Sequence, residues 1–236
     1  MPPPTRLRQA APAAGVQMYD SLELEQTSTV DRAVEALRQA LFAGELEPGT
    51  PLREVALADS LGIARSTVRE ALSLLAAEGL LTRIPYRGVV VAALDPADVH
   101  DVIRARLALE EAGVRAWASA DDDARAAVRA ALENYAAQAR ADGGPGPLAE
   151  THLAFHRTLV ALTGSTRLVA TAEALHGELR LALAGVDRRR RNAREQVAAH
   201  RELLSVIESG DQDAAVTAIR DHLADAEGSI GEAVGR

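Results

Sequence analysis

The chain has 236 residues, of which 47% are apolar and 25% charged, a composition typical of globular proteins with one or two domains. It contains no cysteine, which excludes disulfides, cysteine-bound zinc and thiol catalysis. The net charge of -8 argues against a generally basic nucleic-acid coat, although DNA binding needs only a local basic face.

Residues 1–28 are rich in proline and alanine and lack the apolar core of a signal peptide. We predict that they form a disordered arm. No apolar run of the chain approaches the ~18 residues that cross a bilayer. These observations favour a cytoplasmic protein without a membrane partner.

Three helices are predicted next. Residues 30–43 place apolar side chains at helical spacing, and glycine and proline residues end this run. Two shorter helices, 53–60 and 65–77, are joined by the tight turn Leu61-Gly62-Ile63. A helix, a short turn containing glycine and a second helix form the helix-turn-helix pattern.

A β-hairpin is predicted after the third helix. Two short β-rich runs, 81–84 and 89–92, flank the turn residues Pro85-Tyr86-Arg87-Gly88, so the tip of the hairpin is basic. A helix-turn-helix followed by a hairpin is a winged helix. We therefore predict a winged-helix DNA-binding domain, with three helices and a small hairpin, over residues 29–93.

The rest of the chain is predicted to be helical. Asp95-Pro96 has the residue types of a helix start. The predicted helices occupy residues 96–119, 122–141, 147–163, 166–186, 191–209 and 212–230. The fold class is therefore mainly α, with an all-α antiparallel bundle over residues 94–236 behind the winged helix. The arginine run 188–191 is expected to be a solvated helix start or turn.

The second helix of the helix-turn-helix pattern opens with residues suited to DNA. Arg65 and Arg69 lie one turn apart and share a face, and the arginine fork matches O6 and N7 of guanine. Ser66 and Thr67 are short hydroxyl donors for phosphate or base contacts. Arg87, at the hairpin tip, could enter the minor groove or touch a phosphate.

An alternative interpretation of the same helix is a solvated face on which Arg69 pairs with Glu70 or Glu78. Helix-turn-helix spacing with two arginines also occurs in many proteins that bind no DNA. The basic hairpin that follows favours DNA binding, and double-stranded DNA is the partner that we predict.

A set of short motifs marks residues 36–91. They are Gly44-Glu45-Leu46-x-Pro48-Gly49, Leu52-Arg53-Glu54, Leu61-Gly62-Ile63, Arg65-x-x-Val68-Arg69-Glu70-Ala71-Leu72, Glu78-Gly79-Leu80 and the wing Gly88. With them the stretch closely resembles the N-terminal domain of the GntR family of bacterial regulators. The resemblance implies DNA contacts from Arg65, Thr67 and Arg69 and a wing-tip role for Gly88. We also predict that Arg53 contacts DNA. Val55 occupies a position where the family often has an arginine that contacts DNA.

Four of the six histidines lie on apolar stripes of the predicted bundle helices. His152 and His156 are one turn apart on one helix, and His200 and His222 lie on two others. A single inward histidine is more often a hydrogen-bonded core residue, and every buried ring needs a polar partner. A divalent metal such as zinc, nickel or iron could bind all four rings and so be the polar partner of each. The spacing alone leaves both interpretations open.

Further motifs mark residues 96–230. They are Arg106-x-x-x-Glu110, Phe155-His156, Ala199-His200-Arg201, Gly210-Asp211 and His222. With them the segment resembles the helical FCD effector domain of the FadR-like branch of the GntR family. Many members hold a metal in this bundle through one aspartate and three histidines. His156, His200 and His222 match the three histidines, whereas His152 stands in the position of the aspartate.

The exchange of aspartate for His152 has chemical consequences. A neutral ligand leaves the charge of a divalent metal uncompensated, so the site should attract anionic effectors and favour nickel, copper or zinc over hard cations. A small carboxylate could bind the metal and be clamped by Arg106. We assign Arg106, Glu110 and Arg180 to this effector site, with an internal salt bridge between Arg106 and Glu110 as the alternative.

Together these features predict a ligand-responsive transcription repressor and not an enzyme. We expect a homodimer on a palindromic operator, because one short recognition helix gives too little affinity, and release when a small organic acid binds. One alternative is a constitutive or architectural DNA binder whose bundle only dimerises. Another is a metalloenzyme fused to a DNA-binding module. His152 and His156 have the spacing of a zinc protease, but Leu153 replaces the glutamate that the protease requires.

Overall fold

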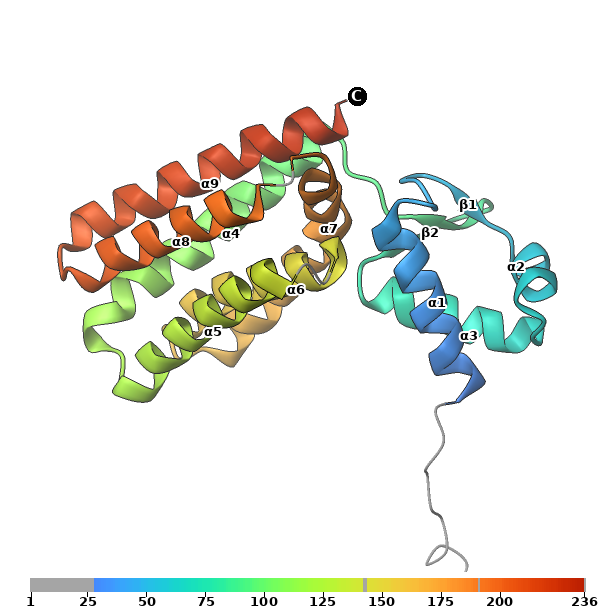
Figure 1. Cartoon of the computed structure of the whole chain (residues 1–236), viewed down its shortest axis with the longest axis horizontal. Helices are drawn as coiled ribbons and strands as arrows, with labels where there is room; N and C mark the ends of the chain where they lie inside the picture. The colour runs from blue at the N-terminus through green and yellow to red at the C-terminus, as the bar shows by residue number, and fades with distance from the viewer. Residues whose placement is uncertain (1–27, 142–143, 191, 236) are drawn as a thin grey trace, which may run out of the picture.

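The computed structural model describes residues 28–141, 144–190 and 192–235 and consists of two helical units (Figure 1). The predicted arm lies outside the described residues, except for Ser28. The N-terminal unit contains α1 Thr29–Ala43, β1 Pro51–Leu52, α2 Glu54–Leu61, α3 Arg65–Ala77, β2 Leu81–Ile84 and β3 Gly88–Val91. No helix of the described ranges combines the length and the apolar character that a membrane span requires.

The N-terminal unit is built on the packing of α1 against α3. α1 starts with a capping box, in which Ser28 and Asp31 each bind the other's backbone, and it ends at Gly44 with a φ of 80°. The apolar faces of the two helices meet in a core that includes Val34, Leu37, Leu41, Val68, Leu72 and Leu75. This packing leaves the opposite face of α3 turned to solvent.

The sheet has three antiparallel strands in the order β1-β3-β2. β2 and β3 form the predicted hairpin, with Thr82 opposite Val90. β1, a strand of 2 residues in which Leu52 pairs with Val89, was not predicted from the sequence. So short a strand has no periodicity of its own and exists because β3 offers it a free edge.

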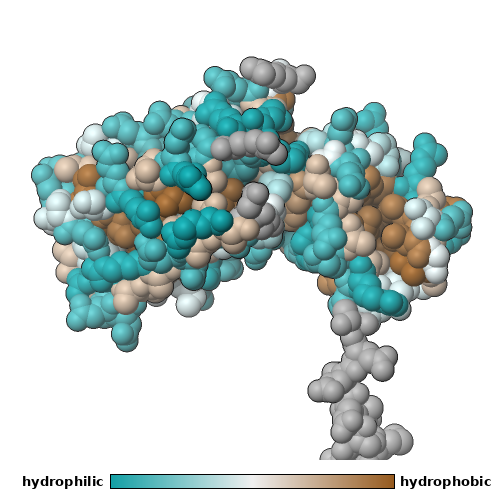
Figure 2. Space-filling view, viewed as in Figure 1, coloured by the Kyte–Doolittle hydropathy of each residue, from teal (hydrophilic) through white to brown (hydrophobic). Residues whose placement is uncertain are grey.

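The second unit is a bundle that confirms the mainly helical fold class. It contains α4 Pro96–Ala116, a 3-10 turn at Trp117–Ser119, α5 Asp122–Ala141, α6 Pro145–Ala161, α7 Thr166–Arg190, α8 Ala193–Glu208 and α9 Gln212–Val234. α9 packs along α4, and α6 packs against both α5 and α7 (Figure 1). The surface drawn in Figure 2 is mostly polar, with smaller apolar patches on both units.

α7 is longer than predicted and corrects one expectation. Its last turn contains Arg188, which is not solvated but partly buried against the N-terminal unit. Arg188 donates a hydrogen bond from Nη1 to the carbonyl oxygen of Phe42 in the last turn of α1. Arg190 pairs with Glu232 of α9 at 2.9 Å. Arg188 and Arg190 therefore bind the end of α7 to α1 and α9. Arg191 lies outside the described residues.

Gly113 lets α4 and α6 approach each other backbone to backbone. A Cβ atom at this position would lie 1.9 Å from the carbonyl oxygen of Leu159, a distance that no side chain permits. The crossing matters for the centre of the bundle, because Glu110 lies one turn before Gly113 on α4 and His156 lies one turn before Val160 on α6. The close approach brings these two side chains together.

Candidate DNA-reading face and buried histidine cluster

α3 presents its first turns to solvent. Arg65, Ser66 and Arg69 are exposed and Thr67 is partly buried, while Val68 faces the core. The first turn of α3 contains no acidic residue, so its positive helix end is open to phosphates. A helix needs these properties to enter the major groove of DNA.

An ion pair with Glu54 holds Arg69. Nη2 of Arg69 lies 2.7 Å from Oε2 of Glu54 at the start of α2, and Nε donates to both carboxylate oxygens. The hydrogen bonds from Arg69 lower the pKa of the Glu54 carboxyl. The alternative in which Arg69 pairs with Glu70 or Glu78 is wrong, since Glu78 pairs with Arg38 at 2.7 Å.

The wing brings further basic residues to the same unit. Arg53 and Arg87 both line a shallow groove of about 640 Å³ on the sheet, and Gly88 at the tip is exposed with a φ of 87°. Tyr86 is fully exposed, which is unusual for an aromatic side chain. Tyr86 was not among the predicted DNA contacts, although its position beside Arg87 at the tip of a predicted wing was a usable signal.

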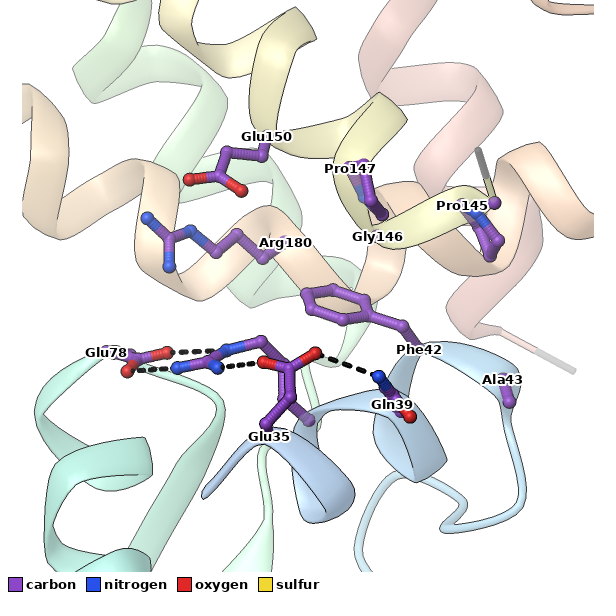
Figure 3. A pocket seen from close by; sticks show the side chains of 12 residues that line it. Glu35, Gln39, Phe42, Ala43, Glu78, Pro145, Gly146, Pro147, Glu150 and Arg180 are labelled. Atoms are coloured by element: carbon purple, nitrogen blue, oxygen red, sulfur yellow. Dashed lines mark hydrogen bonds and ion pairs between the residues drawn. The ribbon is translucent and has the colours of Figure 1, made fainter. Parts of the chain in front are cut away.

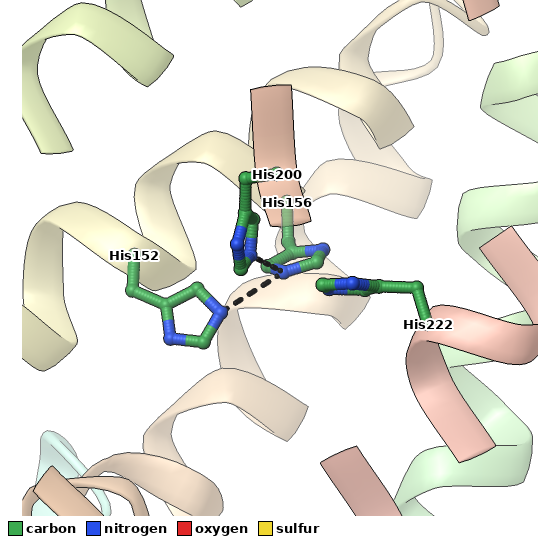
Figure 4. Close-up of side chains that lie close together, drawn as sticks. All are labelled: His152, His156, His200 and His222. Carbon is green, nitrogen blue, oxygen red and sulfur yellow. Dashed lines mark hydrogen bonds between the residues drawn. The ribbon is translucent and has the colours of Figure 1, made fainter. Parts of the chain in front are cut away.

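Four imidazole rings meet in the centre of the bundle (Figure 4). His152 and His156 project from α6, His200 from α8 and His222 from α9. The Nε2 atom of His156 lies 3.1 Å from that of His152 and 3.2 Å from that of His200. One nitrogen from each ring can be chosen so that all four lie within 4.8 Å of one another.

The outer nitrogens of two rings have other partners. Nδ1 of His156 lies 2.7 Å from Oε2 of Glu110, and Nδ1 of His200 lies 2.6 Å from the carbonyl oxygen of Gln196. Both partners accept hydrogen bonds, so each ring carries its proton on Nδ1. The two Nε2 atoms therefore present lone pairs to each other across 3.2 Å. Carboxylate and carbonyl partners of this kind orient histidine ligands of metals.

The four rings are held neutral by burial. Loss of solvent lowers the pKa of every ring, to about 4 for His200 and about 3 for His222, and neighbouring rings and Arg106 add to the effect for His152 and His156. A proton is therefore a poor bridge between the facing lone pairs. Neutral imidazole nitrogens are the form that binds metal.

The size of the cluster fits a single ion. Metal–nitrogen bonds of about 2.0–2.1 Å place two ligands of one ion at most about 4.2 Å apart. The four nitrogens lie within 4.8 Å of one another, so the rings need to move inward only slightly to bind one ion. The cluster could therefore hold a divalent transition metal, through His152 as well as through the three other histidines.

Arg106 and Glu110 form a buried ion pair beside the cluster. Their side chains are 2% and 1% exposed, and Nε of Arg106 donates to Oε1 of Glu110 over 2.9 Å. Glu110 thus contacts Arg106 and His156 through different oxygens. The salt bridge that was the alternative to an effector role for this pair is therefore present. Tyr135 stacks on His152 with ring centres 5.1 Å apart.

Arg180 lies elsewhere. It lines a cleft of about 850 Å³ between the bundle and the N-terminal unit, together with Phe42, Pro147 and Glu150 (Figure 3). This cleft is separate from the histidine cluster. The structure therefore brings Arg106 and Glu110 to the four histidines and leaves Arg180 at the boundary of the two units.

Both units match known families. Residues 29–91 match the family described as bacterial regulatory proteins, gntR family, and residues 101–225 match the FCD domain. The chain belongs to the GntR family. As a GntR regulator with an FCD domain, it is a DNA-binding transcription regulator and not an enzyme.

Relatives resemble this GntR regulator over most of its length. An HTH-type transcriptional regulator of Streptomyces ambofaciens is 36% identical, with 79% of this chain and 78% of that protein covered. A protein of Paenarthrobacter nicotinovorans named as a probable D-xylose utilization operon transcriptional repressor is 30% identical, with coverage of 86% and 89%. A GntR transcriptional regulator from Rhodococcus sp. RHA1 has a similar structure, with a TM-score of 0.69, 26% identity and coverage of 86% and 98%.

Proposed function

We propose that this GntR regulator is a metal-containing repressor that leaves its operator when a small carboxylate binds in the bundle. The facing lone pairs of His156 and His200, 3.2 Å apart in a buried and uncharged cluster, carry this proposal. They support a site that a bound cation would complete. The bundle is connected to a unit with an exposed recognition helix, so effector binding in the bundle can change the affinity for DNA.

The DNA-binding part of the proposal uses α3 and the wing. Arg65, with Ser66 and Thr67, would meet base edges and phosphates in the major groove, and Arg69 would join them from the same face. Arg53, Arg87 and Gly88 would contact the backbone or the adjacent minor groove. Two copies are needed for a palindromic operator, because one short helix gives limited affinity, so we propose a homodimer acting in the cytoplasm.

The proposed domain division lies between residues 93 and 94. Residues 29–93 would bind DNA, and residues 94–236 would bind the effector and dimerise. The two hydrophobic cores support this division, since nearly every member of the smaller core lies before residue 94.

His152, His156, His200 and His222 would hold the metal, with zinc, nickel or iron as candidates. None of these ligands is charged, so the bound ion would offer a strongly positive position for a carboxylate oxygen. Arg106, already close to the cluster through Glu110, would add a second attraction for an anion. A repressor role is supported by the name of the Paenarthrobacter relative, although the operon named there belongs to that protein.

The proposal is tested by gel shift with the DNA upstream of the protein's own gene. Dimeric protein should retard this fragment at low salt, and Arg65→Ala should weaken binding by about 1–3 kcal/mol. Arg104→Ala, which removes an exposed arginine of α4, is the matched control and should bind normally. Absence of retardation at low salt would refute DNA binding. Retardation that neither a chelator nor any carboxylate changes would indicate a constitutive DNA binder.

A further inference from the structure

Two unpartnered polar atoms lie in the bundle near the histidine cluster. Within the described residues, the buried side-chain atoms that lack a hydrogen-bond partner are Nη2 of Arg106, Nε2 of His176 and Oδ1 of Asn192. A buried polar atom without a partner is unfavourable, so each such atom calls for an explanation. Arg106 and His176 are 2% and 4% exposed and come from the adjacent helices α4 and α7.

Arg106 keeps a free donor despite its ion pair. Its Nη2 lies 2.9 Å from Oε1 of Glu110 within the ion pair, but only Nε forms a hydrogen bond to that oxygen, and Nη2 has no hydrogen-bond partner. The other carboxylate oxygen of Glu110, Oε2, lies 2.7 Å from Nδ1 of His156. The free donor is therefore separated from the histidine cluster by a single side chain.

His176 is a neutral ring on α7, which packs against α4, the helix of Arg106. Burial, followed by the charge of Arg106, lowers the pKa of His176 to about 4. A neutral imidazole has one N–H group, and Nε2 can carry it. Arg106 and His176 can thus offer two buried donors to one acceptor group, which suits a carboxylate.

The helix that carries His176 also contacts the recognition helix. Gly177 is in backbone contact with Gly79, where a Cβ atom would lie 2.8 Å from the carbonyl carbon of Gly177. Glu78, the C-cap of α3, lies directly before Gly79. Four residues after Gly177 on α7, Leu181 is part of the hydrophobic core of the N-terminal unit.

We infer that His176, with Arg106, binds the second carboxylate of a short dicarboxylate effector and that α7 transmits this binding to α3. The inference rests on the proposed function, in which the first carboxylate lies at the histidine cluster. A hydrogen bond to His176 favours one position of α7. Because Gly177 touches Gly79 through backbone atoms, no flexible side chain lies between them to absorb a shift. The end of α3 therefore moves with α7, and effector and DNA favour different positions of the helix.

The experiment compares full-length, metal-loaded wild type with His176→Leu and His176→Gln. Malonate and succinate are the dicarboxylate probes, and acetate is the monocarboxylate probe. Two quantities are measured: the Tm without DNA and the Kd for the upstream DNA fragment. Gln keeps an N–H donor near the place of Nε2, and Leu does not. His100→Leu is the control, since His100 is exposed on α4 and pairs with Glu227, away from the cluster.

A dicarboxylate should raise the Tm of the wild type and of His100→Leu by several degrees and raise their Kd for DNA at least tenfold. Acetate should do neither. His176→Leu should lose at least nine-tenths of both responses, and His176→Gln should keep part of them. Metal content identifies folded variants, and His176→Gln decides the test if His176→Leu does not fold.

Three results would overturn the inference. One is an unchanged dicarboxylate response in His176→Leu. Another is a wild type that binds DNA but responds to neither dicarboxylate in either measurement. The last is a His176→Leu variant that keeps the Tm response and loses only the response on DNA, because His176 would then not contact the ligand. If the wild type does not bind the DNA at all, the proposed function fails, while the Tm measurements still decide whether His176 binds a dicarboxylate.

Discussion

Nε2 of His156 and Nε2 of His200 lie 3.2 Å apart, and neither atom carries a proton. Glu110 and the backbone of Gln196 take the Nδ1 protons of the two rings. A buried arrangement of this kind is repulsive until a cation lies between the rings. The predictions below follow from this contact, from the DNA-reading face and from the helix crossing that brings the cluster together.

Removal of the Glu110 charge should weaken metal binding. Glu110→Gln replaces one carboxylate oxygen with an NH2 donor, so Arg106 and His156 can no longer both donate to this side chain. The loss of such a partner costs about 10- to 100-fold in metal affinity. The measurement is competition against a chromophoric chelator. Glu111→Gln is the control, because Glu111 pairs with Arg115 and Arg220 outside the cluster. Equal affinities of the two variants would show that Glu110 does not orient a metal ligand.

The metal-free protein should lose stability in acid below about pH 6.5. The folded-state pKa of His222 is about 3 and that of His200 about 4, both below the ordinary value of 6.5. The unfolded chain therefore binds more protons in this range, so the free energy of unfolding is constant above pH 6.5 and falls as the pH drops towards 4.

Urea unfolding after chelator treatment measures this pH dependence. His222→Gln removes one titrating ring, so the slope between pH 6 and 4 should decrease by about 1.4 kcal/mol per pH unit. A slope that is the same in His222→Gln and wild type would contradict the neutral state of the partly buried His222 ring.

Glu54→Gln should strengthen the dependence of DNA binding on salt. The substitution removes a negative charge from the DNA-reading face and releases Arg69 to a phosphate. One additional phosphate contact makes the slope of log K against log salt steeper by about 0.9. Glu195→Gln, an exposed change of the same charge on α8, controls for net charge. A shallower slope would mean that Glu54 positions Arg69 for DNA instead of competing with it.

Alanine substitutions at two helical glycines should change the stability of the protein in opposite directions. Gly113→Ala forces α4 away from Leu159 of α6 and should destabilise the protein by about 3 kcal/mol or more. Gly228→Ala, on α9 with nothing within 4 Å of the new Cβ, should stabilise it by about 0.5–1 kcal/mol. Thermal unfolding measures both. A small effect of Gly113→Ala would show that the helix crossing tolerates a side chain.

Most helices were predictable because their signals are local. The predicted helix 65–77 coincides with α3, and the predicted strand 81–84 coincides with β2. The helix 166–186 was too short, because the arginines after Val186 look like solvated residues in the sequence. In the structure Arg188 finds the last turn of α1, a contact between residues far apart in the chain.

The partners of the charged side chains were harder to predict than the helices. The pair of Arg106 and Glu110 was foreseen because the two residues are one helical turn apart. The pair of Arg69 and Glu54 was missed because it joins two helices whose crossing depends on the turn between them. Arg180 was assigned to the effector site, but the rotation of α7 places it in the cleft between the units.

The order of residues along the chain was enough to locate the winged helix, the helical bundle and four inward histidines, since periodicity, caps and turn residues act over a few positions. Only the packing of distant helices decided that the four rings share one centre, that Glu110 supports it and that His176 lies unpartnered on the helix touching α3. Distances between helices depend on side-chain volume at each crossing, as Gly113 illustrates, and no local pattern of the sequence encodes them.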